Sequence, residues 1–223
     1  MSVLKPHTEL FTGAQLALWP DLAQVPHDFV LYGGTALAIR LGHRVSADFD
    51  FFTNRAFTPD ILVREIAFLG DAQRIQSSPN TLTCLVNRGD WVKVSFFGGV
   101  NMHRVANPDI VDGPGFWVAS FLDLAATKIK AVQDRADAKD YIDIAKLLDE
   151  GIALPVALAA AKAVYGAHFN SLLTIKALCY FEDGDLPTLP TDIRKRLISA
   201  VKKTDIENIP VIQSETSGLY PAK

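Results

Sequence analysis

The sequence has only two cysteines, Cys84 and Cys179, among its 223 residues. This excludes a disulfide framework and favours a reducing compartment, so we expect a cytoplasmic protein. No apolar run is long enough to span a bilayer, because the longest, residues 152–164, contains a proline and a lysine. The first residues, MSVLKPHTELF, lack the apolar core and cleavage site of a signal peptide, so we expect none.

A large excess of charge of either sign is also missing. The 22 lysines and arginines against 25 aspartates and glutamates give a net charge of −3. A basic footprint over the whole protein, typical of nucleic-acid-binding domains, is therefore absent, which leaves room only for a local basic patch. Glycine (14) and proline (12) are ordinary in number beside 49% hydrophobic residues, which excludes a disordered or collagen-like chain.

The residue pattern changes character near residue 117. Short β-rich runs alternate with helical patterns before it, and almost every segment after it has helical periodicity. We therefore predict an α/β (α+β) fold with a short mixed sheet flanked by helices and a helical C-terminal half. The predicted organisation is an α/β core over 1–116, a helical region packed on it over 117–203, and an irregular tail over 204–223. The main predicted strands are 28–32, 47–52, 81–86 and 91–97, and the main predicted helices are 10–22, 35–41, 59–69, 138–148, 155–165, 170–181 and 191–203, with another after Ser120.

The most informative segment is LYGGTALAIRLGHRVSADFDFF, residues 31–52. Gly33 and Gly34 stand where a predicted strand turns into a predicted helix, so backbone amides there can approach a ligand closely. The start of a helix presents unpaired N–H groups that can hold a phosphate, and Thr35 adds a hydroxyl. A Gly-Gly pair by itself is more often only a turn.

Two acids follow this turn. On a strand, Asp48 and Asp50 point to the same face, because side chains alternate. Two adjacent carboxylates repel unless a cation lies between them, and Mg²⁺ suits such a site because it also takes phosphate oxygens and water. Two such ions form the clamp used for nucleotidyl transfer. Asp-X-Asp alone is often only a solvated strand face, but the Gly-Gly turn before it favours the functional interpretation.

These residues resemble the nucleotidyltransferase signature, in which Gly-Gly is followed by Asp-X-Asp. The stretch GGTALAIRLGHRVSADFDFF is most similar to the AbiEii/AbiGii toxin family, and the resemblance extends over 124–148, which end in KIKAVQDRADAKDYIDIAKLL. The family has the nucleotidyltransferase fold, and its members are often toxins with a separately encoded antitoxin. The resemblance implies Mg²⁺- or Mn²⁺-dependent transfer of a nucleoside monophosphate from an NTP to RNA, such as a tRNA 3′ end, or to a protein. Separately, the shortness of the apolar runs leads us to expect no membrane partner.

The resemblance also implies roles for individual positions. The phosphate-binding turn is Gly33, Gly34 and Thr35; the metal-binding pair is Asp48 and Asp50; the nucleotide pocket includes Arg44 and Ser46; the residue contacting the triphosphate is Lys128; and the downstream acid is Asp140. The spacing places Lys128 and Arg135 on one helix face, where both could bind the triphosphate. The alternative is that these cations are solvated or paired with Asp140.

One position departs from the family pattern. Related enzymes usually carry a third carboxylate on a later strand, and the matching residue is Ser95 on the predicted strand 91–97. Serine is not a general base at neutral pH without help, so Asp140 substitutes, or the reaction proceeds without a base, or the protein is impaired. The alternative function is a non-catalytic nucleotide- or RNA-binding protein of the same fold. A metal-dependent glycosyltransferase also uses Asp-X-Asp, but the Gly-Gly turn argues against it.

The last predicted helix is basic. Its cations are Arg194, Lys195, Arg196, Lys202 and Lys203. Such a face is usually only solvated, but it could also contact RNA phosphates.

Overall fold

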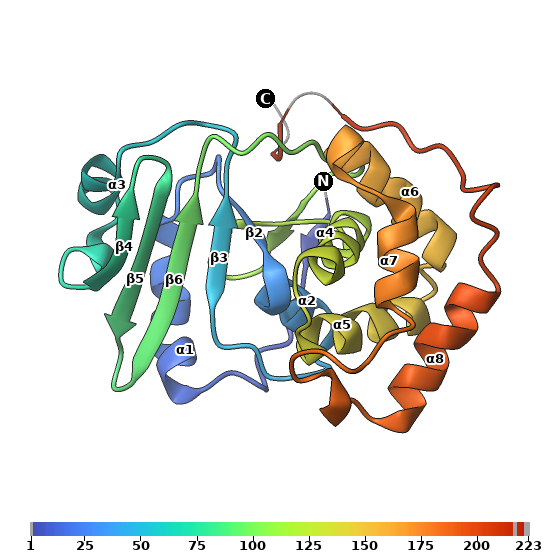
Figure 1. The fold of residues 1–223 in the computed structure, drawn as a ribbon. Helices are drawn as coiled ribbons and strands as arrows, with labels where there is room; N and C mark the ends of the chain where they lie inside the picture. The colour runs from blue at the N-terminus through green and yellow to red at the C-terminus, as the bar shows by residue number, and fades with distance from the viewer. Residues whose placement is uncertain (1, 216–217, 221–223) are drawn as a thin grey trace. The chain divides into compact units, whose positions relative to one another are not determined.

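The computed structural model describes residues 2–215 and 218–220, and the chain divides into two compact units. The sheet unit contains residues 2–102, 107–120 and 218–220. The helical unit contains residues 103–106 and 121–215. Strands and helices are both abundant (Figure 1), so the α/β fold class predicted from the sequence is confirmed.

The described part of the sheet unit is built on one mixed sheet of eight strands. Their order across the sheet is β1-β7-β8-β2-β3-β6-β5-β4. Strand β3 lies antiparallel to β2 and parallel to β6, and β6 lies antiparallel to β5. The strands are β1 (Val3–Leu4), β2 (Val30–Tyr32), β3 (Phe49–Phe52), β4 (Gln73–Ser78), β5 (Thr81–Asn87), β6 (Trp91–Phe97), β7 (Asp109–Val111) and β8 (Trp117–Val118).

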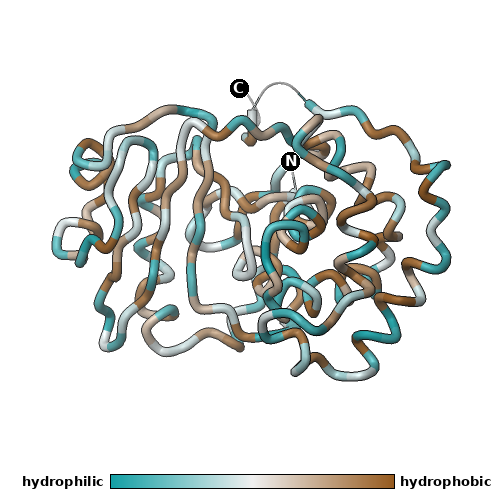
Figure 2. Tube along the Cα trace, viewed as in Figure 1, coloured by the Kyte–Doolittle hydropathy of each residue, from teal (hydrophilic) through white to brown (hydrophobic). Residues whose placement is uncertain are grey.

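The two faces of the central strands differ. Phe49 and Phe51 of β3 are fully buried on one face, together with Val94 and Phe96 of β6. Aromatic rings cover this face, since Phe49 contacts the ring of Trp19 at a centroid distance of 6.4 Å. The opposite face carries polar residues such as Asp50 and Ser95 together with the rings of Phe52 and Phe97. Figure 2 shows the resulting alternation of hydrophobic and hydrophilic residues along the strands.

Helices of the sheet unit lie between the strands in sequence. They are α1 (Gly13–Leu18), the 3₁₀ helix η1 (Trp19–Gln24), α2 (Gly33–Leu41), α3 (Pro59–Glu65) and the 3₁₀ helix η2 (Ala67–Leu69). Helix α2 follows β2 without a connecting loop and ends at Gly42, whose φ of +55° is the left-handed conformation that favours glycine. The predicted helix 10–22 is shorter than expected, because the capping box of Thr12 starts α1 at Gly13 and Pro20 lies in the 3₁₀ turn that follows.

The helical unit contains five α-helices among its described residues. They are α4 (Phe121–Asp134), α5 (Ala138–Asp149), α6 (Leu154–Tyr165), α7 (Ser171–Ala177) and α8 (Thr191–Lys202), with 3₁₀ turns η3 (Gly166–His168) and η4 (Leu186–Thr188). The segment 103–106 joins this unit because the carboxylate of Asp123 in α4 accepts the backbone N–H groups of Val105 and Ala106, at 2.7 and 3.2 Å. Within the described residues, no helix is both long and apolar enough to cross a membrane.

Candidate functional site

The turn between β2 and α2 is built around two glycines. Gly33 has a φ of +78°, and a Cβ atom there would lie 3.2 Å from Oδ2 of Asp50. A Cβ atom at Gly34 would lie 2.7 Å from Nη2 of Arg44 and 2.8 Å from Oγ of Ser46. Any side chain would therefore displace one of these groups. The helix begins at Gly33, two residues earlier than predicted, so the turn itself forms the first residues of α2.

The loop that leads into β3 is held by two buried side chains. Thr35 donates its hydroxyl to the backbone carbonyl of Asp48 and lies 3.0 Å from Oγ of Ser46. Because Thr35 is buried and its hydroxyl is used by the protein, the structure favours a role in holding this loop over the predicted role as a phosphate donor. From the other side, Gln15 donates its Nε2 hydrogen to the carbonyl of Ser46 at 2.8 Å.

Gln15 is a site residue that the sequence did not indicate. Its Oε1 atom accepts a hydrogen bond from the backbone N–H of Thr12 at 3.1 Å. The backbone N–H of Gln15 in turn donates to the hydroxyl oxygen of Thr12 at 3.2 Å. Thr-X-X-Gln is a recognisable capping box, so the start of α1 can be found in the sequence. The contact with Ser46, 31 residues away, has no local signal. Gln15 thus joins the start of α1 to the loop before the acids.

The two acids differ in their backbone setting. Asp50 lies on β3, but Asp48 precedes the first residue of that strand, Phe49. The prediction that both lie on one strand is therefore wrong, because the loop held by Thr35 extends through residue 48. The carboxylate of Asp48 instead pairs with the ammonium of Lys93 at 2.5 Å, and both side chains are partly exposed. Lys93, on β6, is a second residue that the sequence analysis missed.

Ser95 lies beside Asp50. The register of the parallel pair β3–β6 places these two residues opposite each other, and Ser95 is buried. On its other side Ser95 faces Thr83 of β5. The polar row of Asp50, Ser95 and Thr83 therefore contains a single carboxylate, that of Asp50. An acid at position 95, as in related enzymes, would have placed another carboxylate directly beside it.

The carboxylates of Asp48 and Asp50 could hold a divalent cation whose remaining ligands come from the substrate. No group of three metal-binding side chains occurs in the part of the chain that the structure describes. Asp48 and Asp50 supply oxygen donors, and glycine at position 33 avoids a Cβ atom that would lie 3.2 Å from Oδ2 of Asp50. Mg²⁺ commonly uses one or two protein carboxylates and takes its other ligands from phosphates and water. Such a donor set matches Mg²⁺ held jointly with a nucleotide.

In the helical unit, Lys128 lies between two buried carboxylates. Its Nζ atom is 2.7 Å from Oδ1 of Asp140 and 2.8 Å from Oδ2 of Asp143. Arg135 donates from Nε to the other oxygen of Asp140, at 2.7 Å. The side chain of Lys128 is only 7% exposed, whereas that of Arg135 is 60% exposed. Of the two cations, Arg135 is the one whose charge reaches the surface.

The pairing sets the acidity of Asp140. Burial by itself raises the pKa of this carboxyl, but the hydrogen bond from Arg135 and the charge of Lys128 more than offset burial, so the pKa lies below its ordinary value. A carboxylate stabilised in this way is a weak proton acceptor. The alternative raised by the sequence, that Asp140 pairs with nearby cations, is confirmed, and this environment disfavours the predicted role as a general base.

The structure thus gathers the predicted residues into two groups. The sheet unit brings together Gly33, Gly34, Thr35, Arg44, Ser46, Asp48 and Asp50. The helical unit brings together Lys128, Arg135 and Asp140, and adds Asp143.

Comparison with known proteins agrees with this geometry. Residues 18–213 match the family described as "Nucleotidyl transferase AbiEii toxin, Type IV TA system". An uncharacterized protein of Aquifex aeolicus (strain VF5) is 35% identical over 161 residues, which cover 71% of this chain and 76% of that protein.

Two solved structures share the fold. A putative nucleotidyltransferase from H. pylori is 15% identical with a TM-score of 0.56, and the alignment covers 85% of this chain and 92% of that one. The nucleotidyltransferase toxin MenT4 from Mycobacterium tuberculosis H37Rv is 18% identical with a TM-score of 0.56, covering 87% of this chain and 86% of that one. Since the family match spans most of the sequence, this chain belongs to the AbiEii family of nucleotidyltransferase toxins.

Proposed function

We propose that this protein transfers a nucleoside monophosphate from an NTP to an acceptor hydroxyl and releases pyrophosphate, with Mg²⁺ or Mn²⁺ as the metal. The observation that supports this most directly is the fit of Gly33 and Gly34 against Asp50, Arg44 and Ser46. A phosphate chain can approach the start of α2 only where side chains are missing, and here the acids lie beside that same turn.

Each residue of the sheet unit has a part in this proposal. The amides of Gly33 and Gly34 bind phosphate oxygens, and Arg44 neutralises charge on the triphosphate. Asp48 and Asp50 hold the metal, which supplies charge stabilisation at the reacting phosphate when it is bound. A metal bound by Asp48 would compete with the ammonium of Lys93 for this carboxylate, and Lys93 would then be available to contact phosphate. From the family resemblance, we assign Lys128, Arg135 and Asp140 to the same reaction, with Asp140 as a positioning residue for the two cations.

The proposal does not require a strong general base. Positioning of the acceptor hydroxyl and charge stabilisation by the metal and the neighbouring cations can supply most of the catalysis. Ser95 beside Asp50 is compatible with such a reaction. The same serine favours a second candidate function, in which the protein binds nucleotide without turning it over, because the usual third carboxylate is replaced.

The acceptor and the biological partners are also proposed. From the family we infer an RNA acceptor such as a tRNA 3′ end, with a protein side chain as the alternative, a separately encoded antitoxin, and a cytoplasmic location. The family's description as a type IV toxin–antitoxin component supports the antitoxin.

A labelling experiment separates these candidates. The protein is incubated with Mg²⁺, total RNA and each NTP in turn, labelled at either the α- or the γ-phosphate, and the products are resolved on a denaturing gel. Nucleotidyl transfer labels the acceptor from α-labelled NTP only, since the γ-phosphate leaves with pyrophosphate. The variant Asp50→Asn should give no label.

Two other outcomes decide against the proposal. Binding of NTP and Mg²⁺ without labelling, together with labelling gained by Ser95→Asp, identifies the non-catalytic protein. Labelling from γ-labelled NTP identifies a kinase instead.

A further inference from the structure

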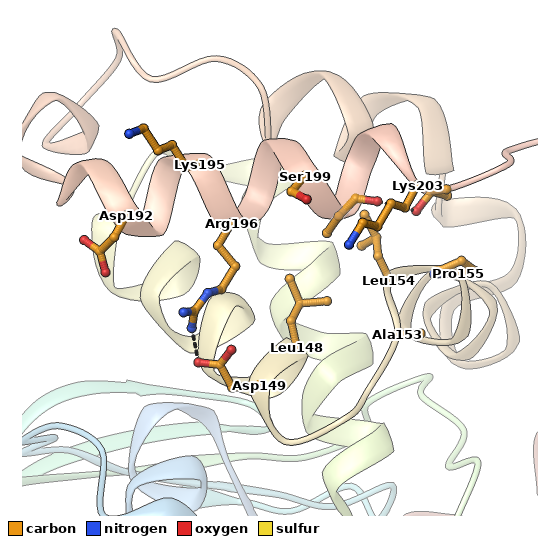
Figure 3. Close-up of a pocket in the computed structure, with 12 residues that line it drawn as sticks. Leu148, Asp149, Ala153, Leu154, Pro155, Asp192, Lys195, Arg196, Ser199 and Lys203 are labelled. Atoms are coloured by element: carbon orange, nitrogen blue, oxygen red, sulfur yellow. Dashed lines mark hydrogen bonds and ion pairs between the residues drawn. The ribbon is translucent and has the colours of Figure 1, made fainter.

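A groove in the helical unit lies outside the candidate catalytic groups. It has a volume of about 770 Å³ and is bordered by α5, α6 and α8 (Figure 3). Its apolar lining is Leu148, Ala153, Leu154, Pro155 and Ala200. In the view of Figure 3, the side chains of Arg196 and Lys203 flank that of Leu148. An apolar floor therefore lies next to cations from a single helix.

The cations belong to one stripe that runs along α8 to its C-cap residue, Lys203. Lys195, Arg196, Lys202 and Lys203 follow helical spacing, and all four residues are exposed. We call these four residues the basic stripe. Its ends, Lys195 and Lys203, are separated by about 12 Å along the helix at 1.5 Å per residue. The fifth cation, Arg194, is directed elsewhere, since it donates to the carbonyls of Leu189, at 3.0 Å, and Leu186, at 3.3 Å.

Most of the stripe has no neutralising partner. Arg196 pairs with Asp149, but Lys195, Lys202 and Lys203 make no ion pair with any described residue. One further acid, Asp192, lines the groove in the first turn of α8, where the helix dipole stabilises a negative charge. Three free cations on one helix face contrast with a chain whose net charge is −3. This local positive charge is complementary to a polyanion.

We propose that the basic stripe and its groove bind a single-stranded segment of nucleic acid, with phosphates on the stripe and a base against the apolar floor. Regularly spaced phosphates match several cations along one helix, and the apolar floor matches the flat face of a base better than it matches another charged group. The proposal rests on the proposed function in one respect: the strand would be the nucleotide acceptor or a part of it.

Salt-dependent binding tests this directly. The probe is a fluorescein-labelled single-stranded RNA decamer of mixed sequence, and its binding to the full chain is followed by fluorescence anisotropy from 50 to 300 mM KCl. EDTA replaces Mg²⁺, so that the metal-dependent site does not contribute and no transfer occurs. If three cations contact phosphates, the logarithm of the affinity should fall with the logarithm of salt with a slope of about −2.

A double variant and a matched control locate the surface. Lys195→Gln/Lys203→Gln should reduce the salt slope by about 1.4, because each lost phosphate contact in a single strand removes about 0.7. Lys162→Gln/Lys176→Gln removes two exposed lysines of α6 and α7 that make no ion pair with any described residue, and should leave the slope unchanged. The substituted side chains make no bonds within the described residues, so all variants should keep the melting temperature of the parent.

The role of the groove floor has its own readout. An abasic strand of the same length and charge should bind several-fold more weakly than the RNA, and Ala200→Phe, which fills the groove, should remove that difference. Equal binding of both strands overturns the base contact. Equal loss of binding in the stripe and control variants overturns the surface assignment, and tighter binding of polyglutamate than of RNA identifies an acidic protein partner instead. Because the assay involves no turnover, failure of nucleotidyl transfer and failure of strand binding are observed separately.

Discussion

Replacing Gln15 by methionine should lower catalysis, whereas an equal loss of stability at the same helix start should leave catalysis nearly unchanged. Methionine has about the length of glutamine and is apolar, which suits this buried position. The change removes two hydrogen bonds: one from Nε2 to the carbonyl of Ser46 and one to Oε1 from the N–H of Thr12. The first loss frees the loop that ends at Asp48, and the second weakens the start of α1. The matched control is Thr12→Ala, which weakens the same helix start without removing a bond to the loop.

The expected magnitudes follow from these bonds. Each hydrogen bond contributes about 0.5–1.5 kcal/mol to stability, so Gln15→Met should cost about 1–3 kcal/mol. Loss of an N-cap threonine costs about 0.5–2 kcal/mol, so the control lies in a similar range. Catalysis should separate the two variants, because a displacement of about 1 Å at a reacting group can reduce the rate about 100-fold. Only Gln15→Met changes what holds Asp48 in place.

The assay measures kcat and KM for the NTP identified by labelling, together with thermal unfolding, at a temperature where both variants are folded. Gln15→Met should lower kcat by at least tenfold and raise the Mg²⁺ concentration needed for half-maximal rate. Thr12→Ala should keep both values within about twofold of the parent. If both variants lose activity in proportion to their lost stability, or if Gln15→Met turns over like the parent, the loop is positioned by something other than Gln15.

Three further substitutions follow from the same contacts. Gly34→Ala should raise the KM for NTP several-fold with little change in melting temperature. The reason is that the new Cβ atom would displace the flexible guanidinium of Arg44, whose Nη2 atom lies 2.7 Å from that position. An unchanged KM would argue against a place for Arg44 in the nucleotide pocket. Lys93→Met should tighten Mn²⁺ binding in the absence of nucleotide by about 1.4- to fivefold, since a partly exposed ion pair such as that with Asp48 is worth about 0.2–1 kcal/mol. Weaker binding in a titration followed by electron paramagnetic resonance would contradict this. Asp140→Asn should cost about 3–5 kcal/mol in urea unfolding at pH 7, because it breaks a buried pair. The folded pKa of Asp140 is lowered, so its contribution is complete above the ordinary value of 3.8 and is lost as pH falls further; a parent-to-variant difference that stays constant down to pH 2 would argue against this pairing.

The parts of the fold that the sequence predicted have local causes. The hairpin of β5 and β6 follows from two β-branched and aromatic runs around Asn87–Asp90, and it forms with Asn87 opposite Trp91. Helix α5 follows from its apolar spacing and its Asp137 cap, whose side chain accepts the N–H of Lys139. Both signals lie within one element, so they can be read without knowledge of the rest of the chain.

The missed parts depend on distant partners. Strand β4, with the sequence QRIQSS, has all six residues exposed, so no alternation of buried and exposed residues marks it. Strands β1, β7 and β8 have two or three residues each, too short for any periodicity. Likewise Lys93 lies on β6, the strand next to β3, so its pairing with Asp48 depends on how distant parts of the chain are brought together. Sequence patterns therefore indicated the acids, the glycine turn, Thr35 and Ser95, but not the contacts of Gln15 and Lys93.

The order of the segments that form the two units has a consequence for synthesis on the ribosome. Residues 103–106 belong to the helical unit, residues 107–120 return to the sheet unit with β7 and β8, and residues 218–220 return once more. At that last return, the N–H of Leu219 donates to Oδ1 of Asn54 at 2.7 Å. The sheet unit therefore makes its last contact only after the helical unit has been made. A nascent chain stalled within α8 would carry all eight described strands, the glycine turn and both acids, but it would still lack the contact between Leu219 and Asn54.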